Sequence, residues 1–196
     1  MTETKAEKAR SWGGHSRADL RERWGRDDIY LYGSVGSTND VARRLAEEDD
    51  APTGSIVLAG EQVEGRGRQG RPWHSPKDAG VYLSMVFRPA AVPNPELLPL
   101  LAGIGIVREL DGDFPELDPA LKWPNDVMVG DRKLGGVLTE AVWGDRGIRF
   151  LVVGVGLNVR PLSEDVDEEI REGATSLDAE TGGEVPLAEV ADAVIR

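Results

Sequence analysis

The stretch that decides between fold classes is residues 65–73, which read GRGRQGRPW. Its first six letters match G-x-G-x-x-G, the pattern with which dinucleotide-binding folds cradle a pyrophosphate. That fold needs a helix to begin inside the motif and an acidic residue about 20 positions further on. Here Pro72 and Pro76 flank Trp73 and no helical periodicity follows, so the sequence argues against it. A kinase glycine-rich loop is excluded as well, because its lysine-bearing strand and H-R-D loop are missing.

The same stretch carries three arginines, Arg66, Arg68 and Arg71, among three glycines. Glycines leave backbone N–H groups open to a closely approaching anion, and guanidinium forks bind phosphate or carboxylate. The segment alone fits a solvated flexible loop equally well. Its neighbours in the sequence have to decide between the two interpretations.

The composition is that of a globular protein with one domain, or two if one is small. Of the 196 residues, 40% are hydrophobic and 30% are charged. There is no apolar run of the ~20 residues that a membrane span needs, and no signal-peptide pattern. We therefore expect a cytoplasmic protein that has no membrane partner.

Residue counts exclude several kinds of chemistry. The chain has no cysteine and two histidines, which rules out disulfides, cysteine nucleophiles and multi-histidine metal sites. The formal net charge of −12 argues against a nucleic-acid partner, because such partners attract basic surfaces.

The segment 1–28 carries charges of both signs and few apolar residues beyond Trp12, Leu20 and Trp24. We predict a mobile charged N-terminal arm, too short to hold a DNA-binding domain. The folded domain is expected over residues 29–196.

Hydrophobic patterning predicts an α+β fold. Strands are expected over residues 29–31, 55–59, 80–87, 119–123 and 148–159, with a hairpin over 126–142 that turns near 130–131. Helices are expected from residue 37, over 95–110 and over 186–196, while residues 62–77 are irregular. The helix over 95–110 is apolar nearly all round, which predicts a central, buried position. This order favours a mixed, largely antiparallel sheet with flanking helices.

Read with its neighbours, the 65–73 stretch resembles the signature loop of the biotin–protein ligase family, G-R-G-R-x-G-R-x-W. Further matches follow in the family's order: Ser37-Thr38-Asn39 at a helix start, Gln62, KWPND at 122–126, KLGG at 133–136 and GVGLN at 154–158. The resemblance covers about residues 29–196. Several motifs in register are far more specific than one.

The resemblance implies the class II synthetase-like catalytic fold that biotin and lipoate ligases share. It implies a biotin–[acetyl-CoA-carboxylase] ligase, which forms biotinyl-5′-AMP and pyrophosphate from biotin and ATP with Mg²⁺. The biotinyl group then passes to a lysine of a biotin carboxyl carrier domain of a carboxylase. A homodimer is a candidate assembly. Family members often continue into a C-terminal β-barrel, so we expect the domain to be truncated at Arg196 and to lack that barrel.

Two other functions stay open at this stage: a lipoate–protein ligase, and a non-catalytic sensor of biotin or biotinyl-AMP. The biotin carboxylate and the α-phosphate repel each other by about 4 kcal/mol at ~4 Å and an effective dielectric near 20. Their reaction therefore needs positioning and cations rather than a general base. Four cations that the chain carries in its motifs favour the enzyme.

The resemblance, with this chemistry, assigns roles to particular residues. The predicted catalytic residues are Lys133, Arg66, Arg68 and Lys122. The predicted biotin-binding residues are Ser37, Thr38, Asn39, Gln62, Arg66, Gly67, Arg68, Trp73, Lys133 and Gly136. The predicted nucleotide-binding residues are Arg66, Arg68, Arg71, Lys122, Asn125 and Asn158. Asp126 is expected to hold Mg²⁺ or to orient Lys122, while a helix-capping role for Ser37 and Thr38 and a solvated turn for Lys133 are the structural alternatives.

Overall fold

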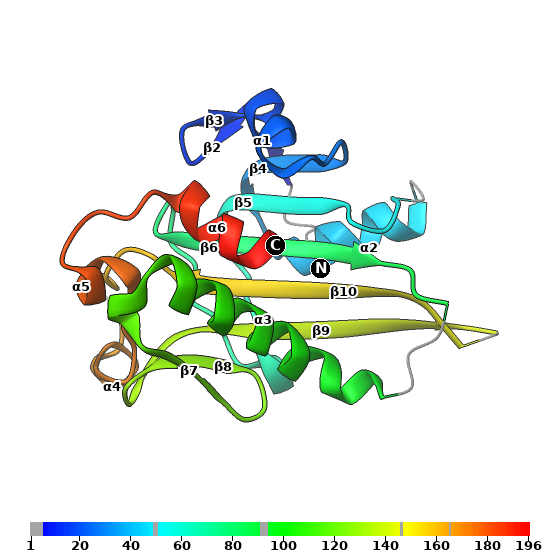
Figure 1. Cartoon of the computed structure of the whole chain (residues 1–196). Helices are drawn as coiled ribbons and strands as arrows, with labels where there is room; N and C mark the ends of the chain where they lie inside the picture. The colour runs from blue at the N-terminus through cyan, green and yellow to red at the C-terminus, as the bar shows by residue number, and fades with distance from the viewer. Residues whose placement is uncertain (1–5, 49–50, 91–93, 146, 165) are drawn as a thin grey trace.

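The fold is built on one eight-stranded sheet, seen in a computed structural model that describes residues 6–48, 51–90, 94–145, 147–164 and 166–196 (Figure 1). The strand order is β1-β4-β5-β6-β10-β9-β8-β7. Among the described strands of this sheet, β4 and β5 pair parallel and every other neighbouring pair is antiparallel. The expected α+β fold with a mixed, largely antiparallel sheet is confirmed.

The bounds of the elements follow the predicted ranges closely in the second half of the chain. The sheet strands are β1 (Glu7–Lys8), β4 (Ile29–Val35), β5 (Ile56–Gln62), β6 (Gly80–Phe87), β7 (Pro119–Lys122), β8 (Asp126–Val129), β9 (Arg132–Gly144) and β10 (Gly147–Asn158). A separate hairpin comprises β2 (Ser11–Trp12) and β3 (His15–Ser16). The helices are α1 (Arg17–Trp24), α2 (Thr38–Glu48), α3 (Leu98–Asp113), α4 (Glu168–Glu172), α5 (Leu177–Thr181) and α6 (Leu187–Ile195), with short 3₁₀ turns at Arg68–Gly70, Pro95–Leu97 and Pro115–Leu117.

Helices cover both faces of the sheet. In Figure 1, α3 and α6 lie in front of the sheet and α2 lies behind it. Strand β5 shows how the sequence serves both layers: Ile56 and Leu58 pack in the core with α6, and Val57 and Ala59 pack in the core with α2. A strand buried on both faces reads as a continuous apolar run, as residues 56–59 do.

The N-terminal residues correct one expectation, because residues 6–28 do not form an arm that lies apart from the domain. Lys8 of β1 pairs with Tyr32 of β4. Trp12 is 3% exposed and its Nε1 donates a hydrogen bond of 3.1 Å to the carbonyl of Ala59. Leu20 of α1 is fully buried. Apolar residues are too sparse here to give a periodic signal, yet nearly every one is used in the core.

Helix α3 corrects a second expectation, because it is an outer layer rather than a central helix. Gly103, Ile106 and Leu110 are buried, whereas Leu101 and Ile104 are 59% and 50% exposed. A helix that is apolar all round can be buried on every side, but here the described residues cover one side. None of the helices in the described ranges is long and apolar enough to cross a bilayer.

Candidate active site

A cleft with a volume of about 1200 Å³ lies beside the start of α2, the glycine–arginine loop, the β7–β8 turn and the ends of β9 and β10. It gathers every residue for which the sequence predicted a role. These are Ser37, Thr38, Asn39, Gln62, Arg66, Gly67, Arg68, Arg71, Trp73, Lys122, Asn125, Asp126, Lys133, Gly136 and Asn158. Drug-sized ligands occupy sites of roughly 300–1,000 Å³, so this cleft has room for two substrates.

Glycines in β10 let side chains lie directly on the sheet. A Cβ at Gly154 would collide with the amide of Asn39, and a Cβ at Gly156 would collide with the indole of Trp73. The indole Nε1 of Trp73 is buried without a hydrogen-bond partner among the described residues. The glycines of the 154–158 motif therefore serve to seat Trp73 and Asn39 against the floor of the cleft.

The start of α2 is held by a side chain from β5. The backbone N–H and Oγ1 of Thr38 donate hydrogen bonds of 2.8 and 3.0 Å to Oε1 of Gln62. The Nε2 of Gln62 donates to Oγ of Ser75 at 3.0 Å. Gln62 thus satisfies a helix N–H that would otherwise lack a partner. Its carbonyl oxygen is engaged by the protein, so a biotin contact through the amide nitrogen stays a prediction.

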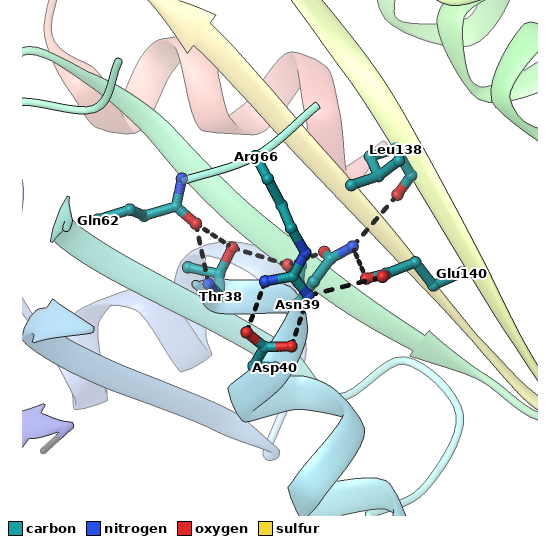
Figure 2. A network of polar contacts seen from close by, with 8 residues as sticks. Thr38, Asn39, Asp40, Gln62, Arg66, Leu138 and Glu140 are labelled. Atoms are coloured by element: carbon teal, nitrogen blue, oxygen red, sulfur yellow. Dashed lines mark hydrogen bonds and ion pairs between the residues drawn. The ribbon is translucent and has the colours of Figure 1, made fainter. Parts of the chain in front are cut away.

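Asn39 lies deeper and is held on two sides. Its Nδ2 donates to Oε2 of Glu140 at 2.6 Å (Figure 2). Its Oδ1 accepts a hydrogen bond of 2.6 Å from Oγ of Ser84. Asn39 and Ser84 are both buried. The side chain of Asn39 is therefore a fixed part of the cleft wall, and its predicted contact with biotin is not tested.

Arg66 extends from the loop towards α2 and β9 rather than into open space (Figure 2). Its Nη1 and Nη2 donate to the two carboxylate oxygens of Asp40 at 2.6 and 2.5 Å, and Nη2 lies 3.5 Å from Oε1 of Glu140. The hydrogen bonds to Asp40 raise the pKa of Arg66, so its positive charge is constant at every physiological pH.

Lys133 is a partly exposed cation that lines the cleft. Its Nζ lies 2.6 Å from Oδ1 of Asp126 and 5.3 Å from the centre of the Trp73 ring. The backbone of Lys133 is fixed by hydrogen bonds of 2.9 Å to Gly173 and Thr175. It is not a solvated turn lysine. Asp126 pairs here with Lys133 and not with Lys122, its cross-strand neighbour in the register.

Three further cations are exposed at the mouth of the cleft: Arg68, Arg71 and Lys122. None of them forms an ion pair within the described ranges. Unpaired cations that converge on a cleft in a chain of net charge −12 suit an anionic ligand.

Asn125 and Asn158 are buried at strand ends and hold neighbouring segments. Nδ2 of Asn125 donates to the carbonyl of Val137 at 2.8 Å, and Nδ2 of Asn158 donates to the carbonyl of Thr175 at 3.0 Å. These bonds give both residues a structural role. Their predicted nucleotide contacts are not tested by it.

The residues that sequence reasoning missed are those that hold the wall in place: Asp40, Ser75, Ser84 and Glu140. A signal existed for Glu140, because strand alternation puts this acidic residue on the same face as Leu138 and Val142. A charged side chain on an apolar face needs a hydrogen-bond or ion-pair partner, which predicts a polar neighbour for Glu140.

The sequence also predicted that Asp126 holds Mg²⁺. No group of three or more histidine, aspartate or glutamate side chains suited to a metal ion occurs in the described part of the chain. Mg²⁺ bound to nucleotide needs only one or two carboxylates beside the phosphates. Asp126 lines the cleft and fits that requirement, so its metal role stays a prediction.

Comparison with known proteins identifies the family. Residues 32–158 match the Biotin/lipoate A/B protein ligase family. The chain is 34% identical to the bifunctional ligase/repressor BirA of Bacillus spizizenii over 157 residues, which are 80% of this chain and 48% of that protein. It is 36% identical over 176 residues to the biotin–[acetyl-CoA-carboxylase] ligase of Mycobacterium tuberculosis, with 82% and 62% of the two chains covered.

Solved structures agree in fold. The biotin protein ligase of Aquifex aeolicus in complex with biotin and ATP superposes with a TM-score of 0.72 at 34% identity, covering 87% of this chain and 68% of that one. The Leishmania major enzyme with biotinyl-5-AMP gives a TM-score of 0.69 at 25% identity, covering 86% and 71%.

Fold and cleft define a catalytic domain of the biotin protein ligase type. The chain belongs to the Biotin/lipoate A/B protein ligase family. It spans about half the length of the Bacillus relative and about three fifths of the mycobacterial one.

Proposed function

We propose that this domain is the catalytic part of a biotin–[acetyl-CoA-carboxylase] ligase, which activates biotin with ATP and transfers it to a protein lysine. The observation that carries the proposal is the position of Lys133. Its ammonium is held by Asp126 at 2.6 Å beside Trp73, in a cleft whose mouth carries Arg68, Arg71 and Lys122. A cluster of positive charges of this kind can hold the carboxylate of biotin and the phosphates of ATP close together.

In the first step, a carboxylate oxygen of biotin attacks the α-phosphorus of ATP. A new O–P bond forms, the bond from the α-phosphorus to the β-bridging oxygen breaks, and pyrophosphate leaves. No proton moves, so the protein needs no general base. Lys133 stabilises the charge at the reacting centre, and Arg68, Arg71 and Lys122 neutralise the phosphates.

In the second step, the neutral ε-amine of an acceptor lysine attacks the acyl carbon of biotinyl-5′-AMP. The C–O bond to AMP breaks, and the new amide nitrogen loses its proton to solvent. The acceptor is a biotin carboxyl carrier domain of a carboxylase.

The remaining assignments follow from position in the cleft. Trp73 forms the apolar wall against biotin, with the backbones of Gly67 and Gly136 beside it. Ser37, Thr38, Asn39 and Gln62 surround the ureido end, Asn125 and Asn158 approach the nucleotide, and Asp126 meets the magnesium ion of ATP. A cytoplasmic location and a homodimer complete the proposal.

Pyrophosphate release tests the proposal and separates it from its alternatives. We expect release with MgATP and biotin and none with MgATP and lipoate. Release that requires lipoate would identify a lipoate ligase instead. Tight binding of biotinyl-5′-AMP without any release would indicate a sensor.

A further inference from the structure

The anionic partners of Arg66 set it apart from the other arginines of its loop. Its guanidinium forms a two-pronged contact with Asp40 and a third contact with Glu140. Two carboxylates around one guanidinium leave this group with a net charge of −1. A group of that sign does not attract a carboxylate or a phosphate, whereas Arg68 and Arg71 have no ion-pair partner in the described ranges.

The carboxylate side of this group is built into the domain. Glu140 lies on β9 and also accepts the hydrogen bond from the buried Asn39 (Figure 2). Ser84 of β6 donates a hydrogen bond to the same asparagine. Asp40 lies in the first turn of α2, where a negative charge is favoured by the helix dipole. Both anions therefore stay in place whether or not the loop moves.

The two ends of the glycine–arginine loop are hydrogen-bonded to each other beside Arg66. Arg66 bridges to Pro72, the N–H of Gly67 donates to the carbonyl of Arg71 at 2.8 Å, and the N–H of Trp73 donates to the carbonyl of Gly65 at 2.8 Å. Residues 67–71 thus form a small turn whose two ends are held together next to Arg66. Fixing Arg66 orients the turn and the exposed Arg68 within it.

We propose that Arg66 is a positioning residue: with Asp40 and Glu140 its guanidinium forms an anchor that orients the glycine–arginine loop, and the guanidinium does not contact substrate. This inference rests on the proposed function, and it assigns the loop's charge for the substrates to Arg68 and Arg71. It replaces the expectation that Arg66 binds biotin and nucleotide.

Trypsin cleavage after Arg68 tests the anchor without any need for activity. We compare the wild type with Asp40→Asn, Glu140→Gln and Arg66→Lys, and use Arg43→Ala, an exposed arginine on α2, as the control. The first three should be cut faster after Arg68, by roughly fivefold for Asp40→Asn, the scale of a partly exposed ion pair. The control should match the wild type. Equal rates for all variants would overturn the anchor.

Steady-state pyrophosphate release then separates positioning from substrate contact. Asp40→Asn and Arg66→Ala should raise the KM for biotin while changing kcat by no more than about twofold, because a misplaced loop costs binding first. The double variant Asp40→Asn/Arg66→Ala should have a KM for biotin no higher than that of Arg66→Ala alone. Arg66→Lys should have a KM between those of Arg66→Ala and the wild type.

A large fall in kcat for Arg66→Ala, with Asp40→Asn and Glu140→Gln unchanged, would show direct contact with the reacting groups and overturn the proposal. Loss of pyrophosphate release from the wild type itself would instead refute the proposed function, and the trypsin comparison would still decide whether Arg66 is an anchor.

Discussion

Lys133 is fixed in the cleft by contacts with four residues. Its backbone is bonded to residues 173 and 175, and its ammonium is held by Asp126 beside the Trp73 ring. None of these contacts requires a ligand. The charge is therefore already in place before substrates arrive, which is how electrostatic stabilisation avoids a reorganisation cost during reaction.

Substitution of Lys133 by glutamine should remove that charge while keeping most of the side chain's volume. We expect kcat for pyrophosphate release to fall by roughly 100-fold to 1,000-fold, as when one stabilising donor is lost. The thermal midpoint should change little, because the lysine is partly exposed. The control is Lys77→Gln, an exposed lysine outside this cleft. Wild-type kcat in Lys133→Gln would remove the lysine from the chemistry.

At this scale the sequence predicted residues that the fold brings to one cleft, but it did not predict which side chains hold them there. The residues with predicted roles, from Ser37 to Asn158, all line one cleft. The partners that hold them, such as Asp40 and Glu140, lie outside any motif and become visible only when strands β9 and β6 are brought beside α2. Residue types indicate charge and hydrogen-bonding capacity, but partners depend on tertiary contacts.

Among the elements, β10 shows how a strand makes room for side chains from other elements. Gly154 and Gly156 carry no side chain at the positions where Asn39 and Trp73 lie against the strand. The sequence identified GVGLN only as a family motif. The fold gives a physical reason for its glycines, which leave room for Asn39 and Trp73. Each glycine weakens the strand, so packing has to compensate for it.

A methyl group at Gly156 should displace Trp73. We expect Gly156→Ala to destabilise the domain by roughly 1–3 kcal/mol, the cost of overpacking, and to weaken biotin binding measured by calorimetry. Gly105→Ala in α3 is the matched control, since its Cβ would meet nothing within 4 Å. That variant should be neutral or up to about 1 kcal/mol more stable. Unchanged biotin affinity in Gly156→Ala would contradict the role of Trp73 as a wall.

The glycine–arginine loop should respond to ligands. Ordering a backbone residue costs roughly 1–2 kcal/mol, so whichever substrate orders the loop first lowers that cost for the second. We expect ATP, in the form of a non-hydrolysable analogue, to bind more tightly in saturating biotin. Titration calorimetry with and without biotin measures the difference. Identical affinities would mean that the loop does not couple the two sites.

The two elements that sequence patterning described wrongly, residues 6–28 and α3, fail for related reasons. Burial depends on what lies opposite an element, and patterning reports only the element's own side chains. Trp12 is buried although its segment is mostly polar, and Ile104 is exposed although its helix is apolar. The strands of the sheet were predicted better, because neighbouring strands impose the alternation that the sequence displays.

Across the whole molecule, the two ends of the described chain are joined through Asp192. Oδ2 of this α6 residue accepts from Nη2 of Arg23 at 2.5 Å, and Oδ1 accepts from Nε1 of Trp24 at 2.8 Å. Burial raises the pKa of Asp192, but the hydrogen bonds from Arg23 and Trp24 outweigh it and hold the pKa below its ordinary value. The N-terminal segment is thereby attached to the helix that covers the sheet.

Asp192→Asn should weaken this junction in a pH-dependent way. A lowered folded-state pKa adds stability that is present above the unfolded-state pKa, near 3.9, and is lost as pH falls through the folded-state value. We expect a loss of about 1 kcal/mol at pH 7, the scale of a partly exposed pair, and a difference from the wild type that shrinks below about pH 4. Urea unfolding at several pH values measures it. Asp111→Asn, an exposed residue near the end of α3, is the control and should track the wild type.

The most direct test of the site is a crystal structure of the chain with bound biotinyl-5′-AMP. We predict that the acyl phosphate lies within hydrogen-bond distance of Lys133 and Arg68, with Trp73 against the biotin rings and Arg66 still paired with Asp40. An adenylate bound elsewhere, with Lys133 and Arg68 in bulk solvent, would contradict the assignment of this cleft as the place where biotin and ATP react.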